Sequence, residues 1–443
     1  MPENGFVDVA TRTAGSHSLG VPGLGKFAPG AGPTIASDGT VLLVTEQGKV
    51  IALHADGTPY WNRDLSATAE RFLTSPAVGA DQSVYVVGRR SARVRDHVHN
   101  REYGTNFAVL HKFTKGGGAP PFSAPFPEVP RPGAEPGEYG PWFLSAPAVW
   151  RSGTTEAVIV AAVYPNIGGN EVHVVAFDTN GQLIEDHKVS DVSSGDVTGS
   201  GITDQWWDLM RALFPWFEFK HGSLEEGYMA EVPEVTFLPR RAPFRPLVAV
   251  VDRFNSQLVG YAFCTGPYCD KPGFTEVFRN SFTHTRLQSS PTPLPDSHVA
   301  VGTTDGVVFG GVNNLPSLPP VANIGSIYAR PTVAKDGRLI VVTTDGFVVT
   351  LENGQAVQRL RIGGTVVRPA ASRTHVFVAT ATGLYTLDAL AETQLLEFPW
   401  IKGGLQSPAI GPDGRVYAMA SNDLFIFPPP FNVPIRIPSV SVS

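Results

Sequence analysis

The stretch "RPTVAKDGRLIVVTTDGFVVTLENG", residues 330–354, holds one complete structural unit. Pro331 leads a short strand, and the Asp336-Gly337 pair that follows is typical of a two-residue hairpin turn, because such a turn needs positive φ angles. The next run, "RLIVVTT", is β-branched, nearly continuous and bounded by turn residues, which indicates a buried strand. Another strand, "FVVTLE", then closes the unit.

The same unit recurs along the whole chain. Other clear copies begin at Gly32 and Ser407, and weaker copies begin at Ser75, Ala146, Val232, Ser290 and Arg368. Eight prolines mark the copies: Pro33, Pro76, Pro147, Pro233, Pro291, Pro331, Pro369 and Pro408. The last four are 40, 38 and 39 residues apart. A period of about 40 residues with several short strands in each unit is typical of a β-propeller blade.

We therefore predict an all-β chain that forms a single eight-bladed β-propeller over residues 31–430, with four strands in each blade. Two excursions interrupt the period, at about residues 89–142 and 189–229. Residues 1–30 are predicted to form an N-terminal segment whose "GFVDVAT" closes the ring as a strand beside the last blade, since an open edge invites aggregation. Residues 431–443 are predicted to be a C-terminal tail.

Composition agrees with a large, turn-rich core. The 443 residues include 46 glycines and 39 prolines, with 42% hydrophobic and 17% charged residues. The net charge of −6 gives no basic footprint for nucleic acid. No apolar stretch approaches the roughly 20 residues that span a bilayer. The N-terminus has neither the basic nor the apolar region of a signal peptide, so either the protein is cytosolic or the sequence lacks its leader.

The repeats resemble the pyrroloquinoline-quinone-type propeller repeat, found in quinoprotein alcohol dehydrogenases and in non-catalytic relatives such as outer-membrane assembly scaffolds. Pieces of the family's Ala-x-Asp-x-x-Thr-Gly-x-x-x-Trp docking signature survive: Ala52, Gly57 and Trp61 in "ALHADGTPYW", and Ala176, Asp178 and Gly181 in "AFDTNGQLI". The resemblance spans roughly residues 30–430 and implies the fold. It does not imply the quinone, because the vicinal cysteine pair is absent and the family's calcium ligands have no counterpart here.

One loop, "DVTGSGITD" at residues 196–204, has the oxygen spacing of a calcium site. Calcium takes six to eight oxygen ligands. The side chains of Asp196, Thr198, Ser200 and Asp204, with the carbonyl of Ile202, would supply them, and the loop resembles the calcium loops of FG-GAP repeats. Thr and Ser stand where those loops have Asp or Asn, so weak binding is expected. The alternative is a glycine-rich turn that ends in a helix cap.

An aromatic segment follows this loop. Thr203 and Pro215 would delimit a short helix over residues 204–214, and more aromatic residues come directly after it. We predict either that the segment covers the propeller's own face or that it binds a partner protein, because exposed aromatic residues form interaction hot spots. The predicted partner-binding residues are Trp206, Trp207, Met210, Phe214, Trp216 and Phe217.

The two cysteines and two nearby histidines complete the candidate sites. Cys264 and Cys269 flank a Gly-Pro turn that could join them in a disulfide, which would favour an extracytoplasmic location; two reduced thiols are the alternative. His97 and His99 have the spacing of a metal-ligand pair on a strand, or are ordinary solvent-facing histidines.

The sequence as a whole favours a non-catalytic binding or assembly module without a quinone. The alternative is a propeller enzyme, either a quinone-dependent dehydrogenase or a lyase or hydrolase, with its site at the channel mouth.

Overall fold

A computed structural model describes Phe27 and most of residues 31–193 and 235–436. Inside these ranges, the residues that it does not describe are 67–69, 73, 97–100, 119–121, 128–139, 142, 167–168, 239–244, 254, 267–268, 270, 295–297, 313–318, 335, 363–366, 381, 389–390, 392–393, 399–405, 421–422 and 428–434.

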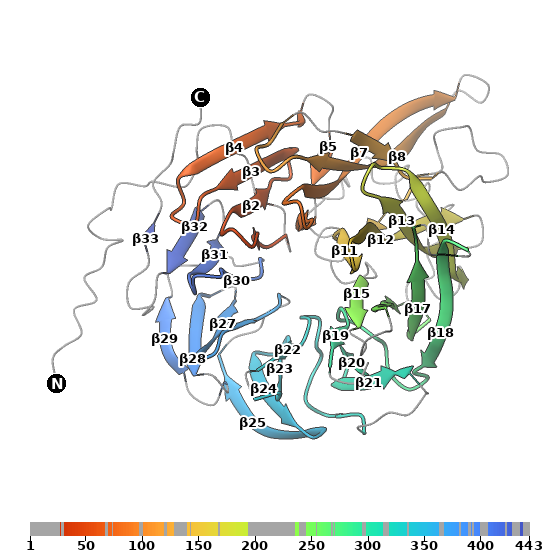
Figure 1. Cartoon of the computed structure of the whole chain (residues 1–443). Helices are drawn as coiled ribbons and strands as arrows, with labels where there is room; N and C mark the ends of the chain where they lie inside the picture. The colour runs from red at the N-terminus through yellow and green to blue at the C-terminus, as the bar shows by residue number, and fades with distance from the viewer. Residues whose placement is uncertain are drawn as a thin grey trace.

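The described elements are all strands, and they form eight antiparallel sheets arranged around a ring (Figure 1). This confirms the predicted eight-bladed β-propeller. Blade 1 comprises β1 (Thr34–Ile35), β2 (Val41–Val44), β3 (Lys49–Leu53) and β4 (Pro59–Asp64). Blade 2 comprises β5 (Glu70–Phe72), β6 (Ala77–Val78), β7 (Val84–Asp96), β8 (Arg101–Phe113) and β9 (Phe122–Pro125). Blade 3 comprises β10 (Phe143–Leu144), β11 (Ala148–Ser152), β12 (Thr155–Asn166), β13 (Gly169–Asp178) and β14 (Leu183–Ser193).

The other five blades are more compact. Blade 4 comprises β15 (Val235–Leu238), β16 (Leu247–Asp252), β17 (Gln257–Cys264) and β18 (Gly273–Ser281). Blade 5 has β19 (Thr292–Pro293), β20 (His298–Gly302) and β21 (Val307–Gly311). Blade 6 has β22 (Thr332–Val333), β23 (Leu339–Val342), β24 (Phe347–Glu352) and β25 (Gln355–Arg361), and blade 7 has β26 (Ala370–Ala371), β27 (His375–Ala379), β28 (Leu384–Asp388) and β29 (Gln394–Phe398). Blade 8 has β30 (Ala409–Ile410), β31 (Val416–Ala420), β32 (Asp423–Phe427) and β33 (Ile435–Arg436).

Three details differ from the sequence expectation. The sheets of blades 2 and 3 have five strands instead of four. The described part of blade 5 has three named strands, and an isolated bridge between Val307 and Val321 takes the place of the fourth. The outer strand of blade 8, β33, comes from residues that we assigned to the C-terminal tail. The ring-closing strand predicted at residues 5–11 lies outside the described residues.

The marker prolines stand where each blade begins at the ring's centre. Seven of the eight directly precede an innermost strand, and Pro233 lies outside the described residues. In three blades the threonine after the proline reaches the next blade, because its Oγ1 donates to the carbonyl of the next marker proline. These bonds join Thr34 to Pro76 at 2.8 Å, Thr292 to Pro331 at 2.6 Å and Thr332 to Pro369 at 2.8 Å. We call these three contacts the threonine clamps.

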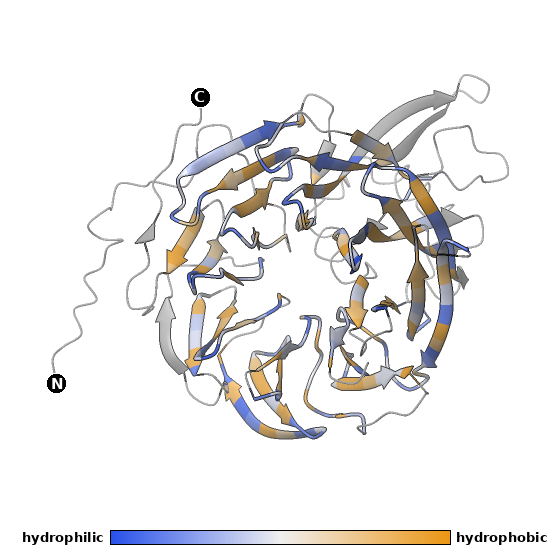
Figure 2. Cartoon of the chain, in the orientation of Figure 1, coloured by the Kyte–Doolittle hydropathy of each residue, from blue (hydrophilic) through white to orange (hydrophobic). Residues whose placement is uncertain are grey.

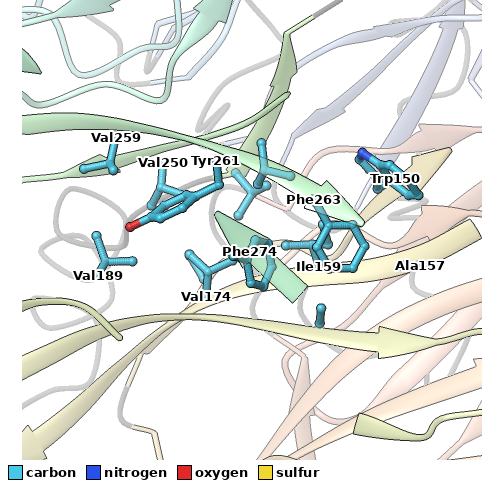
Figure 3. Close-up of a cluster of buried hydrophobic side chains, with 14 of the residues drawn as sticks. Trp150, Ala157, Ile159, Val174, Val189, Val250, Val259, Tyr261, Phe263 and Phe274 are labelled. Atoms are coloured by element: carbon cyan, nitrogen blue, oxygen red, sulfur yellow. The ribbon is translucent and has the colours of Figure 1, made fainter. Parts of the chain in front are cut away.

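Apolar side chains fill the space between neighbouring blades. One cluster joins blades 3 and 4, where fully buried Trp150 packs edge-on against Phe263, with ring centroids 5.0 Å apart (Figure 3). The Nε1 of Trp150 also donates to the carbonyl of Pro246 at 3.2 Å. Figure 2 shows the resulting pattern: middle strands of a blade, such as β2 and β3, are largely hydrophobic, and an outermost strand such as β4 is largely hydrophilic.

The surviving docking tryptophan does pack between blades. Trp61 on β4 donates from Nε1 to the carbonyl of Lys115 in blade 2 at 2.8 Å, and its ring lies against Gly117, where a Cβ would come within 2.3 Å of it. One blade further on, Phe122 on β9 covers Gly181 of blade 3 in the same way. A phenylalanine thus fills, between blades 2 and 3, the place that Trp61 fills between blades 1 and 2.

The strand order defines two faces of the ring. Consecutive strands of a blade are antiparallel, so successive connections alternate between the two faces of the ring. The turn between the second and third strands therefore lies on the same face as the connection to the next blade. We call this the linker face, and the opposite one the turn face. The β7–β8 hairpin is paired as far as Asp96 and Arg101 and extends on the linker face (Figure 1). The chain also leaves β14 and enters β15 on the linker face.

The first excursion is therefore partly sheet. Residues 89–96 and 101–113 belong to β7 and β8, and the second excursion begins after Ser193 rather than at Val189.

Candidate functional site

Most site residues expected from the sequence lie outside the described residues. This holds for the calcium-loop residues Asp196, Thr198, Ser200, Ile202 and Asp204, and for the predicted partner-binding residues Trp206, Trp207, Met210, Phe214, Trp216 and Phe217. His97 and His99 also lie outside. These sites stay predictions.

The cysteine pair is described, and it lies on the turn face of blade 4. Cys264 ends β17, and the Cα atom of Cys269 is 5.9 Å from its own. That separation is one that a disulfide spans, and the structure places the two sulfur atoms together. The guanidinium of Arg245 donates from Nη1 to both sulfurs, at 2.7 Å for Cys264 and 3.5 Å for Cys269. The disulfide in the purified protein stays a prediction.

A cavity of about 350 Å³ opens where the inner strands of blades 2, 3 and 4 meet. β6, β11 and β15 bring its walls together, and Figure 1 shows β11 and β15 next to each other near the centre of the ring. The lining residues are Ala77, Val78, Val149, Arg151, Phe237 and Pro246. Five of the six are apolar, so the cavity suits an uncharged or weakly polar group.

Arg151 is the charged group of this cavity. Its Nε contacts Glu156 at 2.6 Å, and its Nη2 donates to the carbonyl of Val78 in blade 2 at 3.1 Å. Glu156, in turn, accepts from the backbone N–H of Ala80 at 2.9 Å. The arginine therefore ties blade 3 to blade 2, and its charge is balanced by the carboxylate.

A buried polar network in blade 3 was not expected from the sequence. His173 lies between two carboxylates, with Nδ1 2.7 Å from Asp186 Oδ1 and Nε2 3.1 Å from Glu171 Oε2. Lys188 contacts Glu171 at 2.9 Å. Each ring nitrogen of His173 therefore faces a carboxylate oxygen, and which nitrogen donates depends on the tautomer. Because both nitrogens are engaged, this histidine joins β13 to β14 and offers no free lone pair to a metal.

The surroundings of this network stabilise its charges. Burial raises the pKa of Glu171, but hydrogen bonds from Lys188 and His173 outweigh it, so the net pKa lies below the ordinary value. Tyr164 packs on the imidazole with ring centroids 4.7 Å apart. Burial raises the pKa of Tyr164, which stays neutral. The residues of this network are visible in the sequence stretches "EVHVV" and "EDHKV". The sequence does not show the register that pairs the two strands and brings these residues together.

Among the described residues, no group of three or more His, Cys, Asp or Glu side chains is arranged to hold a metal ion. The described histidines outside blade 3 do not form such a group either. His111 is buried in β8, 2.8 Å from Ser123 Oγ, and His284 is exposed on the linker between blades 4 and 5. In the described part of the chain, no helix has the length and apolar character needed to cross a membrane.

The ring, its inner prolines and its inter-blade tryptophan define the protein as an eight-bladed β-propeller built from short repeats. The family model for the outer membrane protein assembly factor BamB matches residues 7–99. That part of the chain is therefore similar to the quinoprotein-like propeller repeat. Curated proteins include no significant match to this sequence.

Two solved structures share the fold over nearly their whole length. BamB from Moraxella catarrhalis superposes with a TM-score of 0.54 at 12% identity, covering 89% of this chain and 92% of that one. Sqt1 from Saccharomyces cerevisiae superposes with a TM-score of 0.57 at 11% identity, covering 96% and 97%. At these identities the likeness extends to the fold.

Proposed function

We propose that this propeller is a protein-binding module that acts in the assembly of a larger complex, and that it carries no redox cofactor. The family model that matches its first quarter describes an assembly factor. Function in propellers is concentrated in excursions and at the axis, because the blades themselves are committed to packing.

The shape of the linker face carries the proposal. Second strands have four or five residues in blades 1 and 5 to 8, as in β2 and β27, whereas β7 has 13. The extra eight residues, 89–96, add about 25 Å at 3.3 Å per residue. The chain also leaves for the stretch between β14 and β15 on this face. A projecting hairpin on the face where the chain leaves β14 is a surface suited to a partner protein.

The residues proposed to contact the partner are five aromatic residues and one methionine in the segment between β14 and β15: Trp206, Trp207, Met210, Phe214, Trp216 and Phe217. Tryptophan and phenylalanine supply large apolar area at low entropic cost, which is why a few of them dominate many interfaces. The calcium loop at residues 196–204 would hold one end of this segment. An extracytoplasmic location is part of the proposal and depends on the Cys264–Cys269 disulfide.

The test is a double variant, Trp206→Ala with Trp216→Ala, and its control is Tyr60→Ala. Tyr60 is an aromatic residue on the outer strand of blade 1, 38% exposed and outside the proposed surface. Affinity capture from the source organism, quantified by mass spectrometry, should lose its specific partner with the double variant and keep it with the control. The melting temperature should stay unchanged in both.

Two results would contradict the proposal. A large fall in the melting temperature of the double variant would show that the aromatic segment covers the propeller itself. A quinone absorbance in the native protein, together with dye-linked alcohol oxidation, would favour the dehydrogenase alternative.

A further inference from the structure

The turn face of blade 4 places one guanidinium against two sulfur atoms. The described residues give Arg245 Nη1 two acceptors, and both are sulfur: Cys264 at 2.7 Å and Cys269 at 3.5 Å. Arg245 is half-buried, as are both cysteines, so the positive charge acts across a partly desolvated gap. A nearby cation stabilises a thiolate much more than it stabilises a neutral sulfur.

The two sulfurs differ in how they are held. Cys264 is the last residue of β17 and pairs with Gly273 on β18, so its backbone is fixed by the sheet. Cys269 lies in the turn beyond, where its N–H donates to the carbonyl of Gly266 at 3.2 Å. Gly266 itself is exposed. The sulfur that is closer to the cation therefore belongs to the anchored strand, and the more distant sulfur belongs to the surface turn.

In thiol–disulfide exchange, the sulfur that leaves departs as a thiolate, and the exchange is faster when that thiolate is more stable. Arg245 stabilises the thiolate of Cys264 more than that of Cys269, because its Nη1 is 0.8 Å closer (3.5 Å against 2.7 Å). The nucleophile consequently attacks Cys269, which is also the sulfur on the surface turn.

We propose that this pair is a site of reversible modification by small thiols, with Cys269 as the sulfur attacked and Cys264 as the leaving group. The thiolate of the external thiol forms a bond to Cys269 Sγ. The Cys264–Cys269 bond breaks, and its electron pair goes to Cys264 as a thiolate that Arg245 holds. The external thiol is oxidised to the mixed disulfide and Cys264 is reduced, so no further oxidant or reductant takes part. The site is on the opposite face from the proposed partner surface and does not depend on it.

The experiment treats the purified, full-length protein with reduced glutathione, quenches the reaction with acid at early times and maps the peptides. Glutathione should be found on Cys269 and not on Cys264. With Arg245→Met, loss of the disulfide should slow about 3- to 10-fold, which corresponds to a rise of about one to two units in the leaving-group pKa. Arg245→Lys should fall between the variant and the native protein, because it keeps the charge but loses the planar guanidinium.

The matched control is Arg415→Met. Arg415 is also on the turn face, but it pairs with Asp413 in blade 8, so the exchange rate should stay at the native value. Mapping of the native protein needs no variant and remains decisive if Arg245→Met does not fold. Glutathione on Cys264, an unchanged rate with Arg245→Met, or two free thiols in native material would each overturn the proposal.

Discussion

The threonine clamps lead to the sharpest prediction about stability. Thr332 is 4% exposed and donates from Oγ1 to the carbonyl of Pro369 at 2.8 Å, which links blade 6 to blade 7. Thr332→Val keeps the shape of the side chain and its β-branching but removes the donor. Pro369 directly precedes β26 and is itself buried, so its carbonyl would be left without the donor in a buried position.

The expected cost follows from that burial. A neutral hydrogen bond contributes about 1 kcal/mol net, and a buried acceptor left without its donor costs about 1–3 kcal/mol. Since valine fills the same volume, no cavity is added to this sum. We expect Thr332→Val to lower the free energy of unfolding by about 2 kcal/mol, a sizeable part of the 5–15 kcal/mol typical of folded proteins.

Urea unfolding measures this loss, and hydrogen exchange localises it. The midpoint should fall without a change in slope, and amide exchange should rise in residues 370–379 before it rises in blade 3. Thr292→Val should cost as much, because Thr292 is 3% exposed and bonded at 2.6 Å, whereas Thr34→Val should cost less because Thr34 is half-buried. Thr332→Ser keeps a donor and is the control. Equal stability of Thr332→Val and the native protein would refute the reasoning.

Three further predictions concern other parts of the ring. Burial raises the pKa of Asp38, but hydrogen bonds from Lys115 and Thr40 and the charge of Lys115 bring it down to about 2 from 3.8. The stabilising effect of the Asp38 carboxylate is therefore complete above about pH 4 and is lost as the pH falls toward 2. The difference in melting temperature between the native protein and Asp38→Asn should shrink over that interval, and a constant difference would contradict this. Trp150→Ala should lower the free energy of unfolding by about 3–5 kcal/mol, because it leaves a cavity between blades 3 and 4 and removes the donor to the carbonyl of Pro246. If the urea midpoint shifts no more than in an exposed-site variant such as Val357→Ala, the contact is dispensable. Calorimetric titration of chelator-treated protein with millimolar calcium should give heat that Asp196→Ala abolishes, and no heat in the native protein would discard the site.

The sequence predicted the blades well because their signals are local. The inner strand begins directly after Pro331, and a turn with Gly337 at a φ of +90° follows it. The turn has three residues rather than the expected two, because the N–H of Ala334 donates to the carbonyl of Arg338. The contacts that complete the ring are not local. The bond from Trp61 to Lys115 spans 54 positions, and the docking signature marks Trp61 but not its partner. The bond from Arg330 to Thr236 spans 94 positions, and neither residue belongs to a recognised motif. Sequence analysis did not predict the contacts of His173 with two carboxylates for the same reason, because they depend on the register of β13 and β14.

The ring divides into a regular half and a specialised half. Blades 5 to 8 keep the period of 38–40 residues, and two of the three threonine clamps join blades 5, 6 and 7. Blades 2 to 4 hold the longest strands, the axial cavity, the His173 network and the cysteine pair, and their inner strands are joined by Arg151 and Trp150 instead. The ring stays closed only if every pair of neighbouring blades stays in contact. The irregular structure of blades 2 to 4 therefore depends on the stability that the contacts among blades 5 to 8 provide. Loss of a clamp in the regular half should therefore weaken the protein without changing glutathione exchange at Cys269, whereas Arg245→Met should change the exchange with little effect on unfolding.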